Sequence, residues 1–272
     1  MQYLFDILIF LFGAALGSFL NVIADRYNTG LPWWQGKSFC FSCNEKLRII
    51  DLFPVLSFLF LKGRCRYCGS RIPREAFIVE IVMGSLSILA AVKIGLIGSD
   101  FSLILNSYFL IQYFVLIAIF SILFLITLYD LRHFIIPNSF LIILFLFSFT
   151  YNSISTLSLN PYPLILAFLS GVILALPFLL LFLISRGRWL GLGDVKYIAV
   201  MGFLLGISNG VSAIFLAFWI GALYALFALY VSKKKLTMKS EVPFGPFLSL
   251  GTAISLCIEL DLLHLNDLSI LF

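Results

Sequence analysis

Two aspartates, Asp130 and Asp194, could act together on a substrate at a membrane. Each lies at the end of an apolar segment, in a chain with only 13 acidic residues. A carboxylate at the centre of a membrane helix costs roughly 2.5 to 3.5 kcal/mol, so such a residue usually has a partner or a function. Two carboxylates within a few ångströms of each other share a proton, because both cannot easily ionise. Such a pair hydrolyses amides: the carboxylate takes a proton from water while the carboxylic acid polarises the scissile carbonyl.

The sequence around Asp194 is GLGDVK, which begins at Gly191 and ends at Lys196. Gly191 and Gly193 remove side-chain bulk and permit unusual backbone angles, so a substrate strand could come close to the carboxylate. Lys196 either raises the local potential or marks the membrane boundary, and we favour the second interpretation.

Four cysteines form a second pattern with chemical meaning. Cys40 and Cys43 make one Cys-x-x-Cys pair, and Cys65 and Cys68 make another after 21 residues. Four thiolates at this spacing can close a tetrahedral zinc site, with each pair forming a tight knuckle. Two disulfides are disfavoured in a reducing compartment, and one redox-active dithiol would not need a second pair. We expect this loop to lack a core of its own, so metal binding would supply folding energy.

The composition predicts the elements that must position these residues. The chain has 272 residues, of which 62% are hydrophobic and 11% are charged, and its mean hydropathy is +1.10. This is more apolar surface than a soluble domain could bury, so the sequence predicts a polytopic membrane protein. The net charge of +5 does not come from a basic arm, and we therefore expect no nucleic-acid partner.

Apolar runs close to the length of a spanning helix predict an all-α fold with about eight transmembrane helices. They cover residues 3–24, 76–97, 108–129, 136–151, 162–184, 195–207, 211–231 and 247–262. We divide the chain into a first transmembrane helix over 1–24, a polar, cytoplasmic, Cys-rich zinc-binding domain over 25–75, and a transmembrane protease core over 76–272.

The loops predict the orientation of these helices, because Lys and Arg near span ends collect on the cytoplasmic side. If the loops are taken alternately, one set holds 17 of the 18 basic residues and only Lys93 lies outside it. The other set, over residues 98–107, 152–161 and 208–210, holds none. This assignment puts the Cys-rich loop and the ends that carry Asp130 and Asp194 at the cytoplasmic face.

Four further residues are candidates for supporting the site. Glu80, near the start of the second span, is either a site residue or an interfacial anchor. Asn21 either faces the active cavity or hydrogen-bonds a neighbouring helix. Pro243 and Gly245 most simply end a loop and start the last helix.

Five motifs occur in a set order. They are GSFLNV from Gly17, the paired Cys-x-x-Cys loop, Asp130 followed by Ile136-Pro137, GLGDVK, and PFGPFL from Pro243. Together they resemble the bacterial prepilin peptidases, also called type IV leader peptidases. This family commonly has Asp where this chain has Asn138, and we interpret that residue as a helix cap.

The resemblance implies that Asp130 and Asp194 are catalytic and that Pro243 and Gly245 border the active site. It implies a bacterial inner-membrane endopeptidase whose substrates are prepilins or pseudopilins with a short basic leader, cleaved after Gly before a hydrophobic helix. For members with a Cys-rich loop it also implies methylation of the new N-terminus with S-adenosylmethionine.

Two other classes of protein share some of these features. A transporter or channel also uses intramembrane acidic residues, and a zinc-stapled membrane scaffold would need only the cysteines. Because both aspartates map to one membrane face and no internal repeat is visible, the sequence favours the protease.

Overall fold

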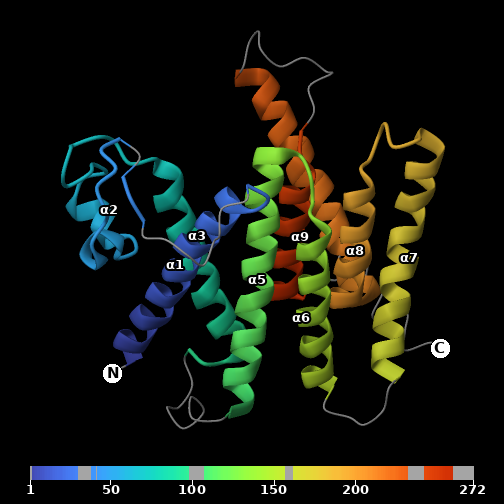
Figure 1. The fold of residues 1–272 in the computed structure, drawn as a ribbon. Helices are drawn as coiled ribbons and strands as arrows, with labels where there is room; N and C mark the ends of the chain where they lie inside the picture. Colours follow the sequence, from blue (N-terminus) through green and yellow to red (C-terminus); the bar gives the residue numbers. More distant parts are fainter. Residues whose placement is uncertain are drawn as a thin grey trace. The chain divides into compact units, whose positions relative to one another are not determined.

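The computed structural model describes residues 2–29, 38–40, 42–97, 107–156, 162–231 and 242–259 (Figure 1). Apart from two isolated β-bridges, the regular structure in these residues is helical. The chain divides into two compact units, Met1–Ile117 and Ala118–Phe272. Helix α5, Ser107–His133, belongs in part to each unit.

The first unit is built on two long apolar helices, α1 (Gln2–Arg26) and α3 (Arg74–Ile94), which pack against each other. Small residues allow their backbones to approach closely. A Cβ on Gly17 would lie 2.8 Å from Cβ of Met83. The first glycine of the GSFLNV motif therefore serves helix packing.

The segment between α1 and α3 carries the four cysteines and two short helical turns. These are η1 (Ile49–Leu52) and α2 (Leu56–Phe60). We predicted a polar loop here, and that description is wrong for residues 49–60, which are mostly large and apolar and many of which are exposed.

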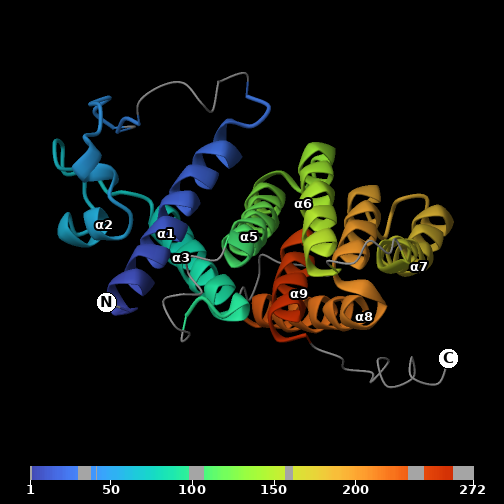
Figure 2. The ribbon, with the colours of Figure 1, turned by 90° about the horizontal axis from the view of Figure 1, so that it is seen from below.

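The second unit is organised around α8 (Leu192–Val231), which packs against α6 (Asn138–Thr156), α7 (Tyr162–Ser185) and α9 (Gly245–Ile258). Helix α8 is broken at Gly206, whose φ of 76° and ψ of −176° are not helical. Figures 1 and 2 show that the chain changes direction there, so α8 consists of two rods.

The break in α8 leaves backbone groups that need partners. In an unbroken helix the carbonyl of Phe203 would accept a hydrogen bond from the backbone N–H of residue 207. Here the side-chain amide of Asn152 on α6 donates to that carbonyl at 2.8 Å. A polar side chain from a neighbouring helix thus stabilises the break inside an apolar bundle.

The prediction of an all-α polytopic membrane protein is confirmed. Among the described residues, five helices are long and apolar enough to cross a membrane, and α6 and α9 are shorter apolar helices. Each predicted apolar run falls on a helix, and the runs over 195–207 and 211–231 fall on the two rods of α8. The turn between these rods lies at Gly206, before the predicted loop.

Some predictions fall outside the described residues. They concern most of the loop over 98–107, the loop residues 157–161, the basic residues Lys233, Lys234, Lys235 and Lys239, and the last residues of the span predicted over 247–262. The three-part domain division stays a prediction.

Candidate active site and cysteine cluster

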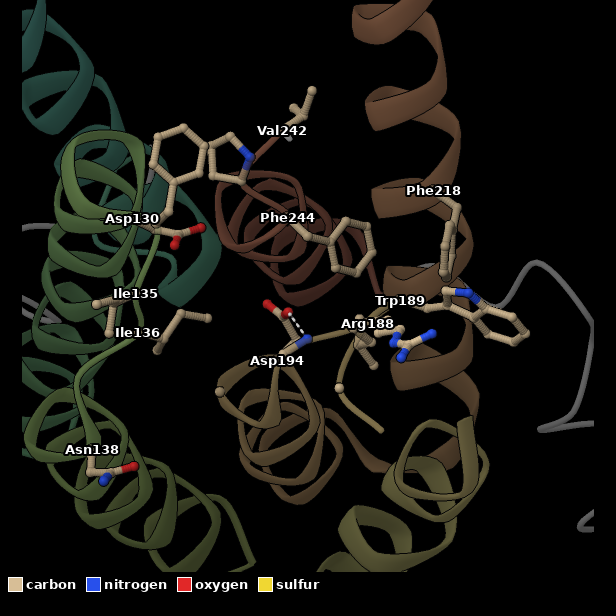
Figure 3. A pocket seen from close by; sticks show the side chains of 16 residues that line it. Asp130, Ile135, Ile136, Asn138, Arg188, Trp189, Asp194, Phe218, Val242 and Phe244 are labelled. Carbon is tan, nitrogen blue, oxygen red and sulfur yellow. Dashed lines mark hydrogen bonds between the residues drawn. The ribbon is translucent and has the colours of Figure 1, made fainter. Parts of the chain in front are cut away.

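Three helix ends in the second unit surround one cavity of about 730 Å³. They are the carboxyl end of α5 and the amino ends of α8 and α9. Asp130 and Asp194, which are 64 positions apart in the sequence, both line this cavity (Figure 3).

Asp130 lies in the last turn of α5, and only 4% of its surface is exposed. Its Oδ2 accepts a hydrogen bond of 3.0 Å from the backbone N–H of Gly245, the first residue of α9. That N–H has no partner within its own helix, so the carboxylate satisfies it. A Cβ on Gly245 would lie 2.6 Å from the same Oδ2, and only glycine allows this approach.

Asp194 is the third residue of α8 and is half-buried. Its Oδ2 accepts a hydrogen bond of 3.2 Å from the backbone N–H of Gly191, just before the helix (Figure 3). This is the reach-back bond of a capping box. The amino ends of α8 and α9 also carry partial positive charge, which favours a carboxylate at each.

Gly191 and Gly193, beside Asp194, both line the cavity, and their role in the approach of a substrate stays a prediction. Neither Gly191 nor Gly193 has a positive φ, so the unusual backbone angles we expected are absent. A Cβ on Gly193 would lie 3.3 Å from Cβ of Ile136, so this glycine lets α8 begin close to the segment before α6. Positive φ values in this region occur at Phe134 and Gly187, which line the cavity, and at Arg186.

Lys196 connects the first turns of two helices that border the cavity. Its Nζ donates a hydrogen bond of 3.0 Å to Oδ1 of Asn138, the first residue of α6. Because an amide oxygen can accept two hydrogen bonds, this contact does not exclude a capping role, and the cap at Asn138 stays a prediction. Both side chains are exposed.

The sequence analysis missed the aromatic lining of the cavity. Phe134, Trp189, Phe218 and Phe244 line it, together with Pro243 and the guanidinium-bearing Arg188. The sequence offered one clue, since three of the four aromatic residues lie within five positions of Asp130, Asp194 or Gly245.

Glu80 and Asn21 belong to the first unit. Glu80 is 9% exposed, and its Oε2 accepts a hydrogen bond of 2.7 Å from the backbone N–H of Val55. The Ser18 side chain is a second partner of the carboxylate. Glu80 thus connects α1, α3 and the Cys-rich segment, while Asn21 is half-buried on α1, one turn after Ser18.

The cysteine cluster is built from the same backbone turn used twice. In the first copy, the N–H of Cys40 bonds to the carbonyl of Glu45, and the N–H of Asn44 bonds to the carbonyl of Cys40. In the second copy, 25 residues later, Cys65 bonds to Ser70 and Gly69 bonds to Cys65 in the same way. Asn44 and Gly69 occupy equivalent positions with φ of 56° and 72°, a conformation that Asn and Gly tolerate best.

These two turns bring four sulfur atoms together from Cys40, Cys43, Cys65 and Cys68. All four lie within 4.8 Å of one another, an arrangement that could hold a metal ion. Four sulfurs about 2.3 Å from a tetrahedral ion would be roughly 3.8 Å apart, and Cys40 Sγ lies 3.8 Å from Cys68 Sγ. Hydrogen bonding to the Ser70 hydroxyl lowers the pKa of the Cys40 and Cys68 thiols, which favours the thiolates that metals bind, whereas the pKa of Cys43 is raised among its neighbouring thiols.

Two family models match separate parts of this chain. The Bacterial Peptidase A24 N-terminal domain matches residues 11–94, and the Type IV leader peptidase family matches residues 117–226. A Bacillus subtilis protein named prepilin leader peptidase/N-methyltransferase is 29% identical over 91% of this chain and 92% of its own length. A protein of the same name from Aeromonas salmonicida is 24% identical over 94% of this chain and 91% of its own length. Another from Vibrio cholerae is 26% identical over 76% of this chain and 80% of its own length. No solved structure matches. Because the two family models cover complementary parts of the chain and the relatives extend over most of it, the chain belongs to the type IV leader peptidase family.

Proposed function

We propose that this protein is a membrane aspartyl endopeptidase that cleaves the short basic leader of prepilin-like proteins after Gly. The observation that carries this proposal is the pair of carboxylates, Asp130 and Asp194, on the wall of one cavity. Each could be only a helix cap, because each accepts a backbone N–H at the start of a helix. Two caps that converge on one open cavity are better explained by shared chemistry.

The hydrogen bonds orient the two carboxylates for this chemistry. Gly245 and Gly191 both donate to Oδ2 atoms, and we assign Oδ1 of each aspartate to water or substrate. One aspartate, ionised, takes a proton from a water molecule that attacks the scissile carbonyl carbon. The other, protonated, donates to the carbonyl oxygen. The amino ends of α8 and α9 stabilise negative charge on the pair.

The cavity wall supports a substrate that is partly apolar. Trp189, Phe218 and Phe244 border the space beside the two carboxylates (Figure 3), and Phe134 also lines the cavity. We propose that they contact the first residues of the hydrophobic helix that follows the cleaved bond. Such contacts would also limit water around the carboxylates, which strengthens electrostatic interactions there.

The charge distribution supports cleavage at the cytoplasmic face of the inner membrane. Asp130 lies three residues before the end of α5, and Asp194 lies two residues after the start of α8. The loops that adjoin these two ends belong to the set with nearly all the Lys and Arg residues, which stays on the cytoplasmic side. A basic leader is kept on that side by the same rule.

We propose zinc as the ion held by Cys40, Cys43, Cys65 and Cys68. Four thiolates without a position for water are typical of a structural zinc site. The ion would fix the two backbone turns to each other, since the described residues connect them through only a few side-chain contacts. It takes no part in the proposed hydrolysis.

We further propose that the protein methylates the new N-terminus with S-adenosylmethionine. The support for this activity is the second half of the relatives' printed name. The described part of the chain has no β-sheet of the kind that holds the methyl donor in soluble folds. We therefore assign no residues to the donor.

A mass measurement tests the proposal. Purified protein in detergent would be mixed with a substrate that carries a basic leader, Gly and a hydrophobic helix, with and without S-adenosylmethionine. We expect cleavage after Gly, and we expect Asp130→Asn and Asp194→Asn to abolish it. A further gain of one methyl mass only with the donor would support the second activity. Intact substrate after incubation with folded, metal-loaded protein, across several such substrates, would refute the peptidase assignment.

A further inference from the structure

The Cys-rich segment presents an apolar surface that the metal cluster does not explain. Between the two cysteine turns, η1 and α2 expose Ile49, Ile50, Leu59 and Phe60, of which Ile49 is 86% and Phe60 is 83% exposed. We call these four residues the apolar face. Four exposed large apolar side chains on two helical turns that contact each other mark a surface that binds something.

One hydrogen bond fixes the position of this face relative to α3. Val55, just before α2, has φ of 62° and ψ of −51°, and the N–H of Leu56 bonds to the carbonyl of Pro54 at 2.6 Å. This is the rare γ-turn with positive φ, which is strained for a β-branched residue. The carboxylate of Glu80 accepts the N–H of Val55 at 2.7 Å, and this part-buried bond stabilises the turn.

An aromatic contact gives a second attachment to α3. The ring of Phe58 stacks on Phe77, with centroids 4.6 Å apart and planes 19° apart. A Cβ on Gly63 would lie 2.9 Å from Cζ of Phe58, so the backbone at Gly63 also lies close to this ring. Phe58 therefore faces the protein, while Leu59 and Phe60 point away. Figure 1 shows α2 beside the end of α3 at which that helix begins.

These attachments set the depth of the apolar face in a membrane. Helix α3 begins with the charged residues Arg74 and Glu75 and then becomes apolar, so its start lies at the membrane surface. Phe77 and Glu80 are three and six residues further along, which is about 4.5 and about 9 Å at 1.5 Å per residue. Amphipathic segments in the membrane interface bury their apolar side about 5–10 Å deep.

The charges around the face also match a lipid surface. Lys46 and Arg48 precede it and Lys62 and Arg64 follow it, and all four are exposed. The acidic residue inside the segment, Asp51, forms a salt bridge with Arg66. Nε of Arg66 lies 2.8 Å from Oδ1 of Asp51, so the negative charge is neutralised. Basic side chains at the rim of an apolar surface reach the headgroups while the apolar residues enter the acyl region.

We propose that residues 49–60 lie in the membrane interface, with the apolar face in the acyl region of a bilayer that contains anionic lipids. The cysteine cluster would then be held at the membrane surface by its own polypeptide as well as by α1 and α3. This inference does not depend on the proteolytic activity, because it rests on the first unit alone.

Photo-crosslinking of the full-length protein tests this placement. The photoreactive residue p-benzoyl-phenylalanine would replace Phe60 in one variant and Tyr67, an exposed aromatic residue of the second cysteine turn, in a matched control. Both would be reconstituted in nanodiscs of phosphatidylcholine and phosphatidylglycerol and irradiated. The mass of each protein would then be measured by mass spectrometry. We expect a gain of one lipid mass at position 60 and none at position 67. Metal content and gel filtration would verify that both variants are folded.

Other results would overturn the proposal. A Phe60 variant that is folded but forms no lipid adduct would show that the face is not in the bilayer. Crosslinks to a second copy of the chain, or to an added prepilin-type substrate in place of lipid, would identify a protein partner instead. Equal lipid adducts at positions 60 and 67 would show that the whole Cys-rich segment lies against lipid without the predicted orientation.

Discussion

The cysteine cluster and the aspartate cavity obtain their geometry in opposite ways. Each cysteine pair is positioned by backbone hydrogen bonds between residues at most five apart, and the same turn is used twice with a spacing of 25 residues. Asp130, in contrast, takes its partner N–H from Gly245, 115 residues away. The cluster therefore depends on local turns and on what its four thiolates bind, whereas the cavity depends on the packing of α5, α8 and α9.

This difference predicts that the two sites can be damaged separately. The largest effect is expected for Asp130→Asn, which keeps the shape of the side chain but removes the acid. We expect the cleavage rate to fall by at least about 10²–10⁴-fold, the contribution typical of general acid–base catalysis. Metal content and thermal unfolding should stay those of the wild type. A loss of metal in this variant would show that the two sites are coupled.

Cys65→Ser should produce the reverse result. Cys65 is the buried member of the cluster, and without it the metal content should drop from about one ion per chain to near zero. Hydrogen exchange should become faster over residues 38–72, while α8 and α9 stay protected. Cys257→Ser, on α9 and outside the cluster, is the matched control and should retain the metal. Full metal content in the Cys65 variant would refute the site.

Gly245→Ala would test how closely α9 must approach Asp130. The added Cβ would lie 2.6 Å from Oδ2, so the carboxylate or the helix must move, and a small misplacement of this kind can cost about 10²-fold in rate. Gly191→Ala, whose Cβ would lie 3.2 Å from Oδ2 of Asp194, should cost less. Steady-state cleavage rates of the two variants would measure this order, and equal rates would argue against close contact at Gly245.

Gly69→Ala should affect only the cysteine cluster. Its φ of 72° is left-handed, and a side chain there costs roughly 1–2 kcal/mol. A Cβ would meet nothing within 4 Å, so the backbone is the cause. Metal affinity should weaken while cleavage stays unchanged. Asn44→Gly, at the equivalent position of the first turn, is the control and should be tolerated, and a larger loss there would contradict the repeat.

The smallest effect is expected for Lys196→Met, which removes the hydrogen bond to Asn138 but keeps the length of the side chain. A bond of this kind contributes about 0.5–1.5 kcal/mol, less where solvent screens it, so cleavage should slow by no more than about tenfold. Asn138→Leu should give a similar change, and the double variant should be no slower. Losses that multiply would show that Lys196 acts through another contact.

The contrast between local turns and long-range packing also explains which features of the fold and the site could be predicted from the sequence. The cysteine spacing, the all-helical membrane fold and the approach of Asp130 to Asp194 follow from local patterns and span topology. Among the aromatic lining residues, Phe218 could not be predicted, because it reaches the cavity only through the packing of the second rod of α8. The contacts of Gly193 and Asn138 could not be predicted for a similar reason, since Ile136 and Lys196 lie on other elements.

The apolar face of residues 49–60 was overlooked for a different reason. Its residues are too few for a transmembrane helix, so the search for spans passed over them. Their meaning depends on Val55 and Phe58, whose partners, Glu80 and Phe77, fix them to α3.

The most direct test of the central claim is a comparison of single-turnover cleavage rates for Asp130→Asn, Asp194→Asn and the double variant. If the two aspartates act as one catalytic pair, removing the second adds little once the first is gone. We predict that the double variant cleaves no more slowly than the slower single variant. Losses that multiply in the double variant, or a single variant that cleaves at the wild-type rate, would contradict the account.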